Sequence, residues 1–177
     1  MNLGENNFGN QRSLAEYQAF HGEMAASWEA MGEGGPTLAA LAALCARTLV
    51  NSAAAIDQAS IGRLSLEALA ILYSARDRGI IEVRGVKTAF ETPGRLLAIY
   101  VEESEHRTVA FRSRENPQLT VQFFDGFCEL CRGGLILHHL HRDFTLSRRG
   151  FELAQSIDRR DIEAQLASAT EFGLHES

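Results

Sequence analysis

The chain has 177 residues, 45% of them hydrophobic and 23% charged, so it can bury a full core and is near the size of one domain. A net charge of -6 predicts an acidic surface, which disfavours polyanionic partners unless positive charge is locally concentrated. We expect no signal peptide and no membrane span, and three cysteines, an odd number, indicate reduced thiols in a cytoplasmic protein.

The N-terminal part is predicted to contain a tail and one amphipathic helix. Residues 1–12 are rich in Asn and Gly and poor in apolar side chains, so we expect a disordered tail. Ser13 and Glu16 form a capping box ahead of apolar residues at helical spacing, which predicts a helix that ends near Met31.

An Ala-rich helix is predicted next, over residues 37–56, after the breaker sequence GEGGP at 32–36. Its sole charge is Arg47, which is too little for a helix that is solvated on its own. We therefore expect a homo-oligomer formed through helix 37–56, and burial inside one monomer is the competing explanation.

The middle of the chain is predicted to change from helix to strand. Ser65 is a suitable N-cap for a third helix, and Gly79 is a suitable stop. β-branched and aromatic residues then predict strands at 80–86, 96–102 and 108–112, of which the last two should form a hairpin.

The last third is predicted to hold a helix, a second small hairpin and further helices. Asn116 and Pro117 are a cap and first-turn signal for a helix that ends at Gly133. The expected elements after it are strands at 135–140 and 144–146, a helix at 147–157, and a C-terminal helix with a frayed end at 158–177. We predict a single α+β domain over 13–157, mainly helical with small antiparallel hairpins.

Residues 117–157 resemble the close of a winged-helix domain. The sequence FTLSRRGFELA, residues 144–154, is similar to the F-x-L-T-x-x-G-x-x-L-A ending of many bacterial regulators. The resemblance implies a winged-helix-like fold, in which the helix from Pro117 lies in the DNA major groove and the hairpin contacts the flanking backbone.

The resemblance also indicates candidate DNA-backbone contacts, which are Arg132, Arg142, Arg148 and Arg149. These four arginines stand against one aspartate, Asp143, between residues 132 and 150, a local net charge of +3. The outward positions of the preceding helix hold two carboxylates, Asp125 and Glu129, beside Gln118 and Gln122. Backbone contact is therefore expected rather than base reading.

A second set of basic residues surrounds the helix that Ser65 caps and the strand after it. It consists of Arg63, Arg76, Arg78, Arg84 and Lys87, diluted by nearby carboxylates. A winged-helix order can also be drawn through helix 37–56, this helix and its strands, so this set is an alternative DNA face. The sequence leaves both registers open.

One group of residues has the chemistry of metal ligands, namely Cys128, Cys131, His138, His139 and His141. The two cysteines share a helical face with Phe124 and Phe127, and the alternation of a strand directs the histidines to different sides. We expect core thiols and no bound metal. The same phenylalanines with Phe123 are expected to be core rather than the lining of an effector pocket.

No phosphate-cradling glycine motif, nucleophile elbow or metalloprotease motif occurs, so we predict a non-enzyme with no catalytic residues and no cofactor. Two function hypotheses remain. The first is a DNA-associated transcription regulator of winged-helix type that contacts mainly the phosphate backbone. The alternative is a non-enzymatic protein-protein interaction module that binds no nucleic acid.

Overall fold

The computed structural model describes residues 35–51, 64–86, 96–113 and 115–173. The expected tail at 1–12, the expected helix at 13–31 and the end of the Ala-rich helix at 52–56 lie outside the described residues.

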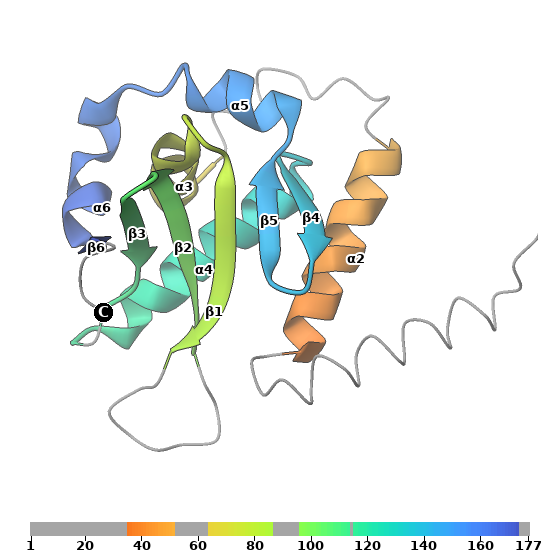
Figure 1. Cartoon of the computed structure of the whole chain (residues 1–177), viewed down its shortest axis with the longest axis horizontal. Helices are drawn as coiled ribbons and strands as arrows, with labels where there is room; N and C mark the ends of the chain where they lie inside the picture. The colour runs from red at the N-terminus through yellow and green to blue at the C-terminus, as the bar shows by residue number, and fades with distance from the viewer. Residues whose placement is uncertain (1–34, 52–63, 87–95, 114, 174–177) are drawn as a thin grey trace, which may run out of the picture.

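The strands lie side by side as a sheet, with helices behind it and at its edges (Figure 1). The helices are α2 (Gly35–Asn51), α3 (Leu66–Ala75), α4 (Pro117–Arg132), α5 (Arg148–Ala154) and α6 (Glu163–Ser168), with a 3-10 turn, η2 (Arg159–Ile162). The strands are β1 (Ile80–Val86), β2 (Leu96–Ser104), β3 (Arg107–Phe111), β4 (Ile136–Leu140), β5 (Asp143–Leu146) and β6 (Thr170–Gly173). The described part of the chain is thus α+β, as predicted.

The strands form one six-stranded sheet in the order β4-β5-β1-β2-β3-β6, and every neighbouring pair is antiparallel. The sequence predicted two separate hairpins, β2–β3 and β4–β5. Strand β1 joins them, because it pairs with β2 on one side and with β5 on the other. The hairpin that the winged-helix resemblance treats as a wing is therefore part of a larger sheet.

The segment expected to be a C-terminal helix and frayed end, 158–177, is more varied than predicted. It holds η2 and the short helix α6, and then β6, which pairs with β3. Four residues are too few for a visible periodicity, and the partner strand lies about 60 residues earlier, so no local signal predicts this strand.

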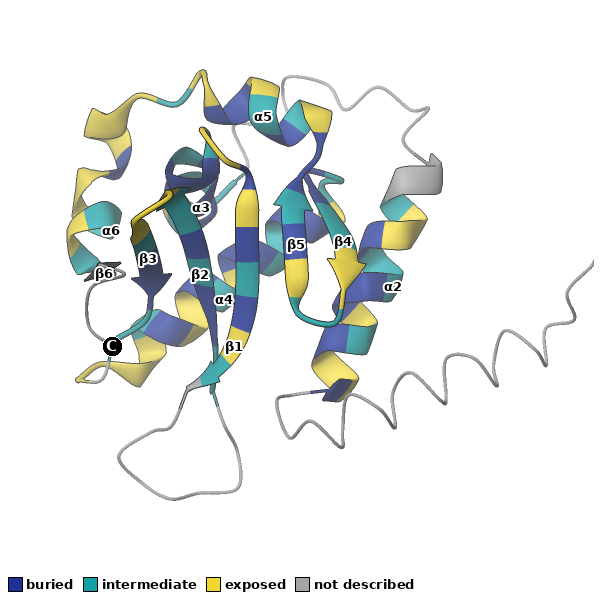
Figure 2. Ribbon diagram, viewed as in Figure 1, coloured by how far each residue is buried: buried dark blue, intermediate teal, exposed yellow. Residues whose placement is uncertain are grey.

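The core lies between one face of the sheet and helices α3 and α4 (Figure 2). Alternation along β1 turns Ile81 and Val83 inward, and both are fully buried. Phe127 of α4 meets Phe144 of β5 edge-on, with ring centroids 5.2 Å apart, and Phe123 is equally buried. The expectation that the phenylalanines of α4 belong to the core is confirmed for Phe123 and Phe127, while Phe124 is partly buried and packs against the core.

Helices α3 and α4 both begin at the predicted N-caps, but only α3 has a side-chain capping hydrogen bond. Ser65 Oγ accepts a hydrogen bond from the Ala68 amide at 3.2 Å, and Gly79 adopts the left-handed conformation with φ of 71°. Asn116 is the N-cap of α4 and Pro117 is its first residue, as predicted, but the Asn116 side chain makes no capping hydrogen bond. Instead Thr120 Oγ1, one turn inside α4, accepts a hydrogen bond from the Ser113 amide at 3.0 Å.

Helix α5 begins at the predicted Ser-x-x-Gly turn. Ser147 Oγ accepts from the Gly150 amide at 3.1 Å, and its hydroxyl donates to the Gly134 carbonyl at 2.9 Å. The helix ends at Ala154 rather than at the expected residue 157. Ser156 explains the difference, because its hydroxyl bonds back to the Leu153 carbonyl at 2.7 Å and competes with the helical pattern.

Helices α3 and α4 approach closely at Gly126. A Cβ atom at this position would lie 2.8 Å from the Ala68 amide nitrogen, so Gly126→Ala must push the two helices apart. We expect the substitution to lower the free energy of unfolding by about 1–3 kcal/mol in urea denaturation.

The control is Gly133→Ala, where the nearest atom to an added Cβ is 3.4 Å away and φ is -75°. This variant should stay within about 0.5 kcal/mol of the parent protein. An equal loss in both variants would contradict the close contact at Gly126.

Candidate functional site

The turn of the β4–β5 hairpin carries one of the predicted DNA-backbone arginines, Arg142. Its carbonyl accepts a hydrogen bond from the Val83 amide at 3.0 Å, which fastens the turn to β1. Its guanidinium forms an ion pair with Glu82, and Arg84 pairs with the same carboxylate. The positive charge of the turn is therefore shared with a carboxylate of the neighbouring strand.

Three other predicted contacts, Arg132, Arg148 and Arg149, lie at the opposite end of β5 from Arg142. The hydrogen bond from the Ser147 hydroxyl to the Gly134 carbonyl brings the start of α5 to the end of α4. Arg148 is 91% exposed and forms an ion pair with Glu152 at 2.9 Å. Strand β5 spans roughly 13 Å at 3.3 Å per residue, so the four arginines do not form one continuous patch.

Helix α4 turns its exposed side away from the hairpin. Its buried side contacts β5 through Phe127 and Phe144, while Gln118, Gln122 and Asp125 are exposed on the other side. Glu129 is half-buried, because its carboxylate accepts a hydrogen bond from the Ser65 amide at 2.9 Å. The helix and the hairpin therefore do not present a single surface to one groove of DNA.

The alternative DNA face is divided between two sides of the molecule. Arg78 pairs with Glu102 at 2.6 Å on the outer face of the sheet, and Arg84 pairs with Glu82 on the same face. Arg76 lies elsewhere, with its guanidinium 3.9 Å from the centroid of the Tyr73 ring. Arg63 and Lys87 of this set lie outside the described residues.

The potential metal ligands do not converge in the described ranges. The ring of His138 donates from Nε2 to the His141 carbonyl at 2.9 Å, and His139 bonds to Thr145 Oγ1 at 2.7 Å. A hydrogen bond with Cys45 and burial both raise the pKa of Cys131, and burial raises the pKa of Cys128. No group of three potential ligands occurs among the residues described, and the absence of a metal stays a prediction.

Burial lowers the pKa of His138, which packs against Phe144, with ring centroids 4.9 Å apart. The unfolded chain therefore takes up this proton at a higher pH than the folded chain. Stability contributed by the neutral ring is complete above the ordinary histidine pKa, and it is lost as the pH falls from there through the lower pKa of the folded chain. We expect the free energy of unfolding to decline between pH 7.5 and 5.5 in urea titrations, and to decline less in His138→Gln.

The control for this pH dependence is His106→Gln, which removes an exposed imidazole from the β2–β3 turn. This variant should keep the decline of the parent protein. An identical decline in the His138→Gln variant would mean that other groups cause the loss of stability.

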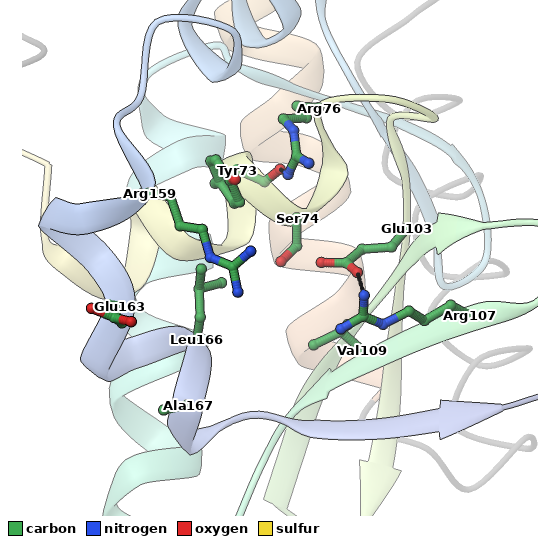
Figure 3. Close-up of a pocket in the computed structure, with 10 residues that line it drawn as sticks. All are labelled: Tyr73, Ser74, Arg76, Glu103, Arg107, Val109, Arg159, Glu163, Leu166 and Ala167. Carbon is green, nitrogen blue, oxygen red and sulfur yellow. Dashed lines mark hydrogen bonds and ion pairs between the residues drawn. The ribbon is translucent and has the colours of Figure 1, made fainter.

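A polar cavity that the sequence did not reveal lies between α3, the β2–β3 hairpin and the η2–α6 segment (Figure 3). Its volume is about 250 Å³. The lining residues are Tyr73, Ser74, Arg76, Glu103, Arg107, Val109, Arg159, Glu163, Leu166 and Ala167. They come from three separate parts of the chain, and only Arg76 was a candidate from sequence, for a different role.

No helix within the described ranges has the length and apolar character needed to cross a membrane. Comparison with known proteins finds no matching family model, no matching curated protein and no matching solved structure. A function for the chain therefore has to be argued from its own geometry.

Proposed function

We propose that the chain is a non-enzymatic protein-protein interaction module that assembles with a second copy of itself. The observation that favours this proposal over DNA binding is that the predicted DNA-contacting arginines lie at opposite ends of β5. Arg142 pairs with Glu82 at one end of β5, while Arg148 lies at the other end and pairs with Glu152. The proposal includes a cytoplasmic location, which suits the free thiols of Cys45, Cys128 and Cys131.

Helix α2 is the proposed contact surface. It packs against α4 and β4 through Leu38, Leu41, Ala42 and Cys45, which are buried. Its other side is low in charge, since Arg47 is the sole charged residue of Gly35–Asn51. Exposed alanines allow an identical helix to approach closely, and such contact would remove apolar surface from water.

The test introduces charge into this surface with Ala40→Glu, at an exposed position of α2. A carboxylate facing its own copy should weaken self-association at least tenfold, because it must be desolvated next to a like charge. Sedimentation equilibrium at micromolar concentrations measures the change.

Gln122→Glu is the matched control, because it adds the same charge at an exposed position of α4 and should leave the association constant unchanged. A parent protein that stays monomeric across the concentration range would overturn the proposed assembly through α2.

DNA-backbone binding is the second candidate, and the cluster of Arg132, Arg148 and Arg149 favours it. These three arginines lie at one end of the fold, where α4 ends and α5 begins, and Glu152 is the carboxylate paired with Arg148. Arginines grouped in this way can contact phosphates, although α4 presents no basic side to a groove.

If this second candidate holds, Arg148→Ala together with Arg149→Ala should weaken binding to all duplexes alike. The slope of log affinity against log salt concentration should fall by about two, since each phosphate contact releases roughly 0.9 of a counterion. Fluorescence anisotropy with random duplexes at several salt concentrations measures both effects.

Arg142→Ala is the control, because Arg142 lies at the other end of β5 and pairs with Glu82. It should change the slope much less than the double variant. No binding by the parent protein at low salt would eliminate DNA as a partner.

A further inference from the structure

The cavity between α3, the β2–β3 hairpin and the η2–α6 segment is lined by more positive than negative charge. Arginines 76, 107 and 159 stand against glutamates 103 and 163, which gives the lining a net charge of +1. The negative charge of Glu103 is neutralised by another lining residue, because its carboxylate pairs with Arg107 at 3.2 Å. The balance favours an anion as occupant.

Arg159 is the cation best placed to meet a ligand. It is exposed at the start of η2, and its guanidinium points into the cavity toward Ser74 (Figure 3). No ion pair links it to any residue that the structure describes. A guanidinium fork in this position can hold a carboxylate or a phosphate with two parallel hydrogen bonds.

Arg76 is held in place on the α3 wall of the cavity. Its guanidinium donates a hydrogen bond to the Tyr73 carbonyl at 2.8 Å and lies over the Tyr73 ring. Its ion pair with Asp77, at 3.6 Å, involves a carboxylate that does not line the cavity. The position of this second cation is therefore fixed before any ligand arrives, which lowers the entropy cost of binding.

Ser74 supplies the second, independent indication of a ligand. Its side chain is 1% exposed and lines the cavity, and the hydroxyl points inward (Figure 3). Among the described residues, its Oγ is the buried side-chain oxygen or nitrogen without a hydrogen-bond partner. Burying a hydroxyl without a partner destabilises a fold, so a group that completes the bond would bind favourably.

We propose that this cavity binds a small oxyanion, a carboxylate or a phosphate, between the guanidinium groups of Arg159 and Arg76, with the Ser74 hydroxyl donating to it. The volume of about 250 Å³ suits a small ligand. Apolar contacts with Leu166 and Val109 suit a short carbon skeleton beside the anionic group. The site is separate from α2 and from the arginines at the start of α5.

The experiment titrates the full chain with acetate, succinate and inorganic phosphate, and with sodium chloride at matched ionic strength. Isothermal calorimetry measures affinity, and thermal denaturation measures Tm. We expect one of the three anions to raise Tm by roughly 5–10 °C at a hundredfold excess over its Kd, beyond the chloride effect. The carboxylate and phosphate arms distinguish the two sources of the oxyanion.

Arg159→Ala should weaken binding of that anion at least tenfold, because it removes a charged hydrogen-bond donor. Arg160→Ala is the matched control, since it removes the neighbouring exposed arginine, which does not line the cavity. Ser74→Ala should weaken binding while leaving Tm without the anion unchanged or higher, a combination that a purely structural serine would not give.

Two results would overturn the proposal. One is a Tm that rises no further with any of the three anions than with sodium chloride. The other is equal affinity in the Arg159→Ala and Arg160→Ala variants, which would assign the effect to general charge screening. Neither result depends on self-association through α2, which is measured separately.

Discussion

Strand β1 forms hydrogen bonds along both of its sides, and the remainder of the sheet depends on this double pairing. On one side it meets β2 in a seven-residue register, and on the other it meets β5. Bonds just beyond the strand extend the second junction, because the Leu146 amide donates to the Gly79 carbonyl at 2.9 Å. An isolated hairpin is only marginally stable in water. Because β1 joins the two hairpins, they share one continuous inner face, on which α3 and α4 pack.

Local chemistry was enough to predict most individual elements of the fold. Strand β1 has the predicted bounds, 80–86, and α3 begins after Ser65 and is followed by Gly79 as expected. These predictions were possible because a cap, a left-handed glycine and β-branched residues each act over only a few positions. The pairing of β1 with β5 could not be predicted this way, since the partners lie about 60 residues apart. Without knowledge of that pairing, the β4–β5 hairpin is predicted from the sequence to be a wing that is separate from the other strands.

The candidate sites were harder to predict than the elements, and the basic residues around α3 show why. Arg76 and Arg78 are two positions apart, so the sequence grouped them into one face. The end of α3 separates them, because Arg76 turns to the cavity while Arg78 pairs with Glu102 on β2. A single serine in a helix does not indicate a binding site. Ser74 becomes a candidate only in the folded structure, where Arg159, 85 residues later, lines the same cavity.

The short strand β6 makes the end of the chain easier to unfold locally than the rest of the domain. The η2–α6 segment forms one wall of the cavity, and β6 fastens its end to β3 through four residue pairs at the edge of the sheet. An edge strand of this length opens by local unfolding at a lower free energy than the whole domain. Opening would detach that wall, so occupancy of the cavity and amide-exchange protection of Thr170–Gly173 are thermodynamically linked.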